Sequence, residues 1–126
     1  MNPAEAFDLL LSYALAFPGA HEDHPWGETV AKVDGKVFVF FGHPDSAKGD
    51  LTFSLKLPKT GGHALQGKHA TPTGYGLGKS GWVSFRYPPD EVPVVEELRA
   101  MVDESWYAVA KKRRIKAWKT ADRQRS

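Results

Sequence analysis

Hydrophobic residues recur at helical spacing near the start of the chain. They lie at i, i+3, i+4, i+7 and i+8, at Phe7, Leu10, Leu11, Ala14 and Leu15. This spacing predicts an amphipathic helix with one apolar face. Asn2 and Pro3 are typical of an N-cap and a first helical residue, and Pro18-Gly19 ends the pattern. We expect this helix to cover a sheet.

The spacing then changes to that of strands. Thr29–Val33 and Lys36–Phe41 flank Asp34-Gly35, a dipeptide typical of a two-residue type I′ turn. Such a turn fixes the register, so that the two residues next to it pair and Ala31 pairs with Phe38. We expect this hairpin to be the centre of the sheet.

Two further segments, Leu51–Leu57 and Trp82–Tyr87, alternate between apolar and polar residues, as half-buried strands do. Between them, Thr60–Lys68 predicts a weak helical turn and the glycine-rich Thr71–Gly81 an irregular segment. Gly42–Asp50 is expected to be a loop. The side chains expected on the open face of the sheet are Thr52, Ser54, Lys56, Trp82, Ser84 and Arg86.

A second amphipathic helix is predicted to start near Pro93. Its inner face would carry Val94, Val95, Leu98, Met101, Val102, Ser105 and Val109. If the same helix continued, Lys112, Arg113 and Lys116 would be buried without partners, which is costly. The packed helix should therefore stop near Ala110. We expect a domain over residues 1–112 and a solvated basic tail over 113–126.

These elements predict an α+β fold. Short connections and a hairpin favour an antiparallel sheet of about four to five strands. Helices at the two ends of the pattern favour a two-layer sandwich in which both lie on one face of the sheet.

Composition narrows the classes of function. The 126 residues contain no cysteine, which excludes disulfides, thiol nucleophiles and thiolate metal sites. No run reaches the roughly 18 apolar residues of a membrane span. The N-terminal segment carries Glu5 and Asp8 and lacks a basic leader, so we expect a cytoplasmic protein with no membrane partner.

Charge is distributed in blocks, although the net charge is only +2. Residues 51–89 carry five basic and no acidic residues, and residues 111–126 carry eight basic residues against Asp122. The remaining two blocks, 1–50 and 90–110, each have a net charge of −5. An anionic partner therefore has two candidate surfaces.

Several short motifs occur in order along the chain. They are Pro25-Trp26-Gly27-Glu28, Val33-x-Gly35-Lys36-x-Phe38, Ser54-Leu55-Lys56, Gly78-Lys79-x-Gly81-Trp82-Val83 and Glu104-Ser105. Together they resemble the MmcQ/YjbR family over about residues 3–112, although Trp106 stands where the family usually has tyrosine. The resemblance implies a frataxin-like (CyaY-like) sandwich. It also implies a small bacterial protein of a family usually labelled as DNA-binding.

Other motifs favour simpler interpretations. Gly78-Lys79-Ser80 resembles the end of a phosphate-binding loop, but Thr73 replaces the required glycine and a strand follows in place of a helix. His21-Glu22-Asp23-His24 could ligate a metal, but a solvated loop is favoured. Trp26 is expected to close one end of the core, with a small-molecule pocket beneath it as an alternative. No serine–histidine spacing indicates nucleophilic catalysis, so we expect no enzyme and no cofactor.

The sequence leads to two hypotheses. The first is a non-enzymatic domain with weak, sequence-tolerant nucleic-acid binding through the open sheet face and the basic tail. The alternative is a chaperone-like protein-interaction module, monomeric or homodimeric, without a nucleic-acid role. The residues predicted to bind nucleic acid are Lys56, Lys79, Trp82, Arg86, Lys111, Lys112, Arg113, Arg114 and Lys116.

Overall fold

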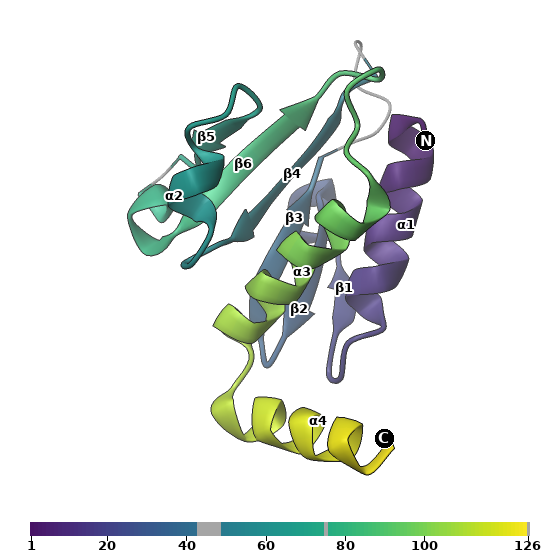
Figure 1. Cartoon of the computed structure of the whole chain (residues 1–126), viewed down its shortest axis with the longest axis vertical. Coiled ribbons are helices and arrows are strands. Elements are labelled where there is room, and N and C mark those ends of the chain that lie inside the picture. The colour runs from purple at the N-terminus through teal and green to yellow at the C-terminus, as the bar shows by residue number, and fades with distance from the viewer. Residues whose placement is uncertain (43–48, 75, 126) are drawn as a thin grey trace.

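A computed structural model describes residues 1–42, 49–74 and 76–125 (Figure 1). The helices are α1 (Pro3–Leu15), α2 (Gly61–Ala64), α3 (Val95–Val109) and α4 (Lys112–Arg125), with short 3-10 turns η1 (Pro25–Gly27) and η2 (Leu77–Ser80). The strands are β1 (His21–Asp23), β2 (Thr29–Val33), β3 (Lys36–Phe41), β4 (Leu51–Lys56), β5 (Ala70–Pro72) and β6 (Trp82–Tyr87). Most of the loop expected at 42–50 lies outside the described residues.

The strands form one antiparallel sheet in the order β1-β2-β3-β4-β6-β5. Helices α1 and α3 contact each other and pack on the same face of this sheet (Figure 1). The predicted α+β two-layer sandwich is confirmed. None of the described helices combines the length and the apolar character that a membrane span requires.

The sheet has six strands, because short strands lie at both edges. β1 was expected as a solvated loop and β5 as part of an irregular segment, and both expectations are wrong. Each strand has only three residues and no apolar alternation, so the sequence carries no periodic signal for it. Each becomes a strand through backbone pairing with its neighbour, β1 with β2 and β5 with β6.

The β2–β3 hairpin forms as predicted near its turn. Asp34 and Gly35 have φ of 53° and 80°, as a type I′ turn requires, and Val33 pairs with Lys36. The predicted pairing of Ala31 with Phe38 is wrong, because a bulge shifts the register and Ala31 pairs with Val39. Phe38 is the extra residue, and the bulge lets it enter the core beside its neighbour.

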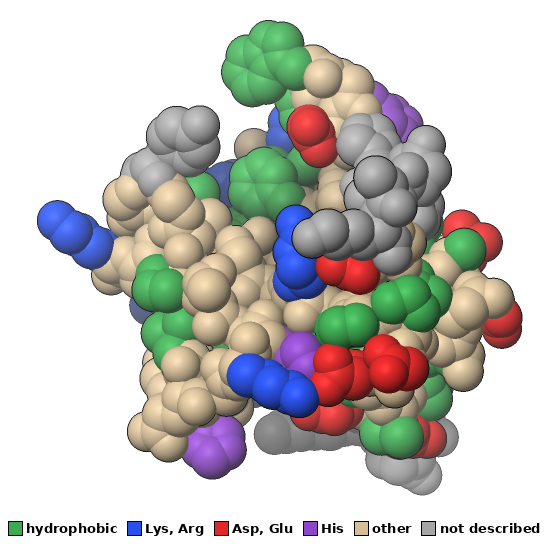
Figure 2. All heavy atoms as spheres, turned by 90° about the horizontal axis from the view of Figure 1, so that it is seen from above, with side chains coloured by type: hydrophobic (Ala, Val, Ile, Leu, Met, Phe, Trp, Pro, Cys, Tyr) green, Lys and Arg blue, Asp and Glu red, His purple; other side chains and the backbone are tan. Residues whose placement is uncertain are grey.

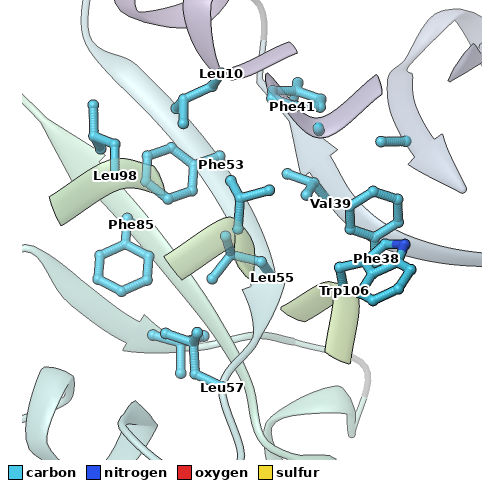
Figure 3. Close-up of a cluster of buried hydrophobic side chains, with 14 of the residues drawn as sticks. Leu10, Phe38, Val39, Phe41, Phe53, Leu55, Leu57, Phe85, Leu98 and Trp106 are labelled. Atoms are coloured by element: carbon cyan, nitrogen blue, oxygen red, sulfur yellow. The ribbon is translucent and has the colours of Figure 1, made fainter. Parts of the chain in front are cut away.

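The core lies between the sheet and the two packed helices (Figure 3). Helix α1 begins as predicted, with the Asn2 side chain accepting a hydrogen bond from Glu5 N at 2.8 Å. The prediction for α3 left out the largest side chain of its inner face, that of Trp106. This side chain is 0% exposed and stacks on Phe17, with ring centroids 5.1 Å apart. Conversely, Val94 was expected inside but precedes the helix and is 66% exposed.

Trp26 does not close the core. It is 98% exposed and has a left-handed backbone conformation, with φ of 51°. The largest fully buried side chain among the described residues is that of Trp106. The expectation for Trp26 is therefore wrong.

The residues expected as a solvated tail form helix α4. Packing of α3 does end at Ala110, as predicted, because this residue is extended, with ψ of 148°. Because the chain changes direction at this break, the inner face of α4 does not continue that of α3. Ile115 and Trp118 of α4 are partly buried against the core. The expectation that residues 113–126 are fully solvated is wrong, because it assumed that they would continue the helix of α3 without a break.

Candidate nucleic-acid interface

The turn of the β2–β3 hairpin holds α4 against the domain. Arg114 Nη2 and Nε donate to the Asp34 carboxylate at 2.8 and 3.0 Å from Oδ1. The backbone N–H of Lys111 donates to the other carboxylate oxygen at 2.9 Å. The Asp34 carboxylate accepts all three of these bonds, and its side chain is 8% exposed. Charge-assisted, forked bonds of this kind are geometrically specific.

Two further observations support this attachment. Hydrogen bonds from Arg114 and from the Lys111 backbone lower the pKa of Asp34 to about 2, so the carboxylate is ionised at neutral pH. Gly19, with φ of 73°, lies directly against the Arg114 guanidinium, where a Cβ atom would collide with it. The guanidinium is therefore enclosed between Gly19 and Asp34.

The attachment leaves four neighbouring basic side chains in solvent. Lys111, Lys112, Arg113 and Lys116 are exposed, and none of them has an ion-pair partner among the residues that the structure describes. Lys119 lies over the Tyr107 ring at 5.6 Å from its centroid. These basic side chains are therefore exposed to solvent on a segment whose position is fixed by the bonds between Arg114 and Asp34.

Beside this helix the sheet divides. β3 and β4 pair from Phe41–Phe53 only as far as Val39–Leu55, while β2–β3 and β4–β6 each continue further. At the point of division Ser105 of α3 takes the place of a strand partner. Its hydroxyl donates to Phe38 O, and its oxygen accepts from Lys56 N at 2.9 Å. Ser105 is buried and both of its bonds are to strand backbone.

A cleft of about 340 Å³ opens between the two arms of the divided sheet. We call it the fork cleft; its lining residues are Lys36, Val37, Phe40, Lys56, Leu77, Trp82, Ala108 and Val109. Phe40 and Trp82 meet edge to face, with ring centroids 5.4 Å apart. Neither lysine is ion-paired within the described part of the chain. The fork cleft is therefore cationic with aromatic walls.

The fork cleft and α4 adjoin each other. Asp34, which holds α4, is separated from Lys36 of the fork cleft only by Gly35. We call the two together the basic end, defined by Lys36 and Lys56 of the cleft and by Lys111, Lys112, Arg113 and Lys116. Five of these six residues were predicted from the sequence to bind nucleic acid; Lys36 was not among them. Its position directly after the turn was the available signal.

The remaining predicted site residues have different surroundings. Trp82 does belong to the open face, pairing in register with Lys56, but it is 8% exposed and forms a wall rather than a free stacking platform. Lys79 is exposed in η2, next to the cleft. Arg86 lies at the far end of β6 and pairs with Asp50 at 3.1 Å, so the structure does not bring it to the basic end.

The end of the molecule opposite α4 differs in charge. Figure 2 views this end and shows basic and acidic side chains interspersed. Ion pairs such as Lys68–Glu91, at 2.7 Å, neutralise basic residues of the 51–89 block. The predicted cationic surface of that block is therefore reduced to its part near the fork cleft.

Two larger hollows lie elsewhere. One, of about 660 Å³, includes Thr52, Ser54, Ser84 and Arg86 of the open face. The other, of about 670 Å³, lies between α2 and α3 and includes His63, Glu97 and Glu104. Glu104 accepts bonds from Lys59 N and Thr60 and so anchors the start of α2. In the first, Ser54 and Ser84 also share a hydrogen bond, at 2.7 Å.

The motif considered for metal binding forms β1 and its flank. His24 lies 2.7 Å from Glu22, and Lys32 lies 3.1 Å from Asp23. Among the described residues no group of three or more potential ligands is placed to hold a metal ion.

Comparison with known proteins identifies the family. A search of curated proteins gave no match. A crystal structure of a protein from Pseudomonas syringae is similar in fold, with 19% identity, a TM-score of 0.57, and coverage of 83% of this chain and 96% of that one. The YjbR family model matches residues 15–108, which confirms the resemblance seen in the sequence motifs. The chain belongs to the YjbR family.

Proposed function

We propose that this protein binds nucleic acid through its basic end. The observation that carries the proposal is that α4 presents exposed cations with no ion-pair partner in the described part of the chain, while Asp34 and Arg114 hold the helix in place. Affinity for a phosphate backbone depends mainly on such cations, and it requires no particular base sequence. A helix that is already ordered does not have to be ordered on binding.

The fork cleft extends the same surface. Its lysines add phosphate contacts next to those of α4, and its aromatic walls accept an unstacked base more readily than a paired one. We therefore propose a preference for single strands, or for strand ends, over continuous duplex. The low exposure of Trp82 makes extended stacking along several bases a poor fit.

Salt dependence tests the proposal. Anisotropy of a labelled oligonucleotide should show affinity falling with a log–log slope of about −4.5 for duplex if about five cations meet phosphates. Raising salt from about 50 to about 200 mM should then reduce affinity about 500-fold. The variant K112Q/K116Q should lower the affinity and reduce the magnitude of the slope by about two.

A matched control separates local from general electrostatics. The variant K68Q/R99Q removes two charges from exposed residues away from α4. Lys68 pairs with Glu91, and Arg99 lies over the Tyr13 ring. It should leave the salt slope unchanged. An equal effect of both variants, or no binding by the wild type at low salt, would refute the proposal.

A second function is favoured by one observation, the exposure of Trp26. An isolated tryptophan in a left-handed conformation is held outward by Pro25 and Gly27. Exposed tryptophans are enriched among the residues that dominate protein–protein binding energy. The alternative function is thus a protein-interaction module in which Trp26 is buried by a partner.

A further inference from the structure

The fork cleft has the chemistry of a site for a small aromatic anion. Lys36 and Lys56 come from its two arms, β3 and β4, and the walls include Phe40, Trp82 and Leu77. Its volume of about 340 Å³ is at the lower end of the range of small-molecule sites. Two cations select against neutral and cationic molecules, whereas the aromatic and aliphatic walls favour a planar apolar body.

The cleft is a consequence of the fold rather than of loose packing. Ser105 satisfies Phe38 O and Lys56 N, the two backbone groups that strand pairing leaves free where the sheet divides. The arms are thereby held apart without an unsatisfied buried polar group. Val109 and Ala108, one turn further along α3, contribute to the lining between them. The opening is therefore present before any ligand arrives.

We infer that the fork cleft binds a phosphate group joined to an aromatic ring, as in a nucleoside monophosphate. The phosphate would lie between Lys36 and Lys56 and the base against the aromatic walls. This inference rests on the proposed function and deepens it, because it names the ligand class of the fork cleft; it does not depend on the phosphate contacts of α4. The same chemistry has two sources, a free nucleotide and the 5′-phosphorylated end of a strand.

Calorimetric titration with adenosine 5′-monophosphate tests the inference. We expect saturable binding that is about 100-fold weaker in K36Q/K56Q, since each of the two lost charged contacts reduces affinity by about tenfold. Both lysines are at the surface of strand ends, so the variant should fold. Adenosine alone and inorganic phosphate alone should each bind more weakly than the nucleotide, because each makes only half of the contacts.

The control variant is K68Q/R99Q, which removes two charges from exposed residues away from the cleft. It should bind the nucleotide within about twofold of the wild type, as expected for distant surface charges. Equal loss in both variants, or an absence of saturable binding by the wild type, would overturn the inference. Binding of phosphate as tightly as of the nucleotide would overturn the role of the aromatic walls.

A second experiment distinguishes a free nucleotide from a phosphorylated strand end, and the proposal for the fork cleft from that for α4. If strand ends are the ligand, a 5′-phosphorylated oligonucleotide should bind more tightly than its 5′-hydroxyl counterpart, and K36Q/K56Q should abolish the difference. Equal binding of both assigns the cleft to free nucleotides. K112Q/K116Q should weaken oligonucleotide binding but leave nucleotide binding intact, so that failure of either proposal is seen without the other.

Discussion

At the scale of single residues, Ser105 shows how one side chain shapes the sheet. It lies on the inner face predicted for α3, where an apolar residue would be the usual choice. Its hydroxyl instead bonds to the backbone of two different strands. A buried serine is tolerated at this position because both bonds are made to groups that otherwise have no partner.

Replacing Ser105 with alanine should destabilise the protein. The change leaves Phe38 O and Lys56 N without partners in the interior, and unfolding by urea should show a loss of about 1–3 kcal/mol. Ser12→Ala, at an exposed position of α1, is the control and should change stability by less than about 0.5 kcal/mol. Equal stability of the two variants would show that the strand ends are satisfied without the serine.

At the scale of elements, the attachment of α4 depends on ionised Asp34. Its pKa in the folded protein, about 2, is lower than the ordinary value of 3.8 because Arg114 and the Lys111 N–H bond to the carboxylate. A lowered pKa means that the contribution to stability is complete above about pH 4. The contribution is lost as the pH falls through the folded value, near 2.

Asp34→Asn should therefore destabilise the protein in a pH-dependent way. Asparagine keeps the left-handed turn geometry but removes the charge. The difference in melting temperature from the wild type should be constant above about pH 4 and should shrink toward pH 2. Asp90→Asn, which neutralises an exposed residue, is the control. A difference that does not depend on pH would show that the turn, not the ion pair, is affected.

The elements also show how far the sequence predicts this structure. Both packed helices, the hairpin turn and the strands β4 and β6 follow from periodicity and from turn residues, because those signals are local. The edge strands β1 and β5 depend on their neighbours and have no such signal. The bulge at Phe38 likewise arises because the core accepts two consecutive residues of β3.

For the candidate site, the sequence identifies the cations but not their arrangement. Charge blocks predict Lys56 and the residues of α4, yet Arg86 is in the same block and is neutralised by Asp50. Asp34 and Ser105 belong to motifs of the turn and of α3, and only the fold brings them to Arg114 and to the divided strands. Trp26 was expected in the core but is exposed, and Trp106 was left out of the predicted inner face but is fully buried.

At the scale of the whole molecule, a net charge of +2 conceals two unlike ends. The cations of the basic end have no ion-pair partners among the described residues, and the opposite end is mixed in charge (Figure 2). Such an asymmetry orients an approaching polyanion before contact and increases the rate of association at low salt. The exposed Trp26 lies on a separate element, η1, and offers a contact that is insensitive to salt.

Self-association distinguishes the two functions at this scale. If Trp26 binds a second copy, sedimentation should show a dimer that persists from about 50 to about 200 mM salt, since an apolar contact is little screened. Trp26→Ser should convert this dimer to a monomer without lowering the melting temperature, because the side chain is exposed. A wild-type protein that is monomeric at all concentrations tested would contradict this contact.

The link between Asp34 and Arg114 also crosses a boundary in the chain. The family model ends at residue 108, whereas α4 begins at Lys112. Asp34 serves the domain itself, because Asp-Gly suits the hairpin turn. A relative with aspartate at this turn would already have one partner of the ion pair that attaches a C-terminal helix. An arginine in that helix would supply the other partner. A relative with asparagine there would keep the hairpin but would lack the charge that strengthens the bonds to the arginine.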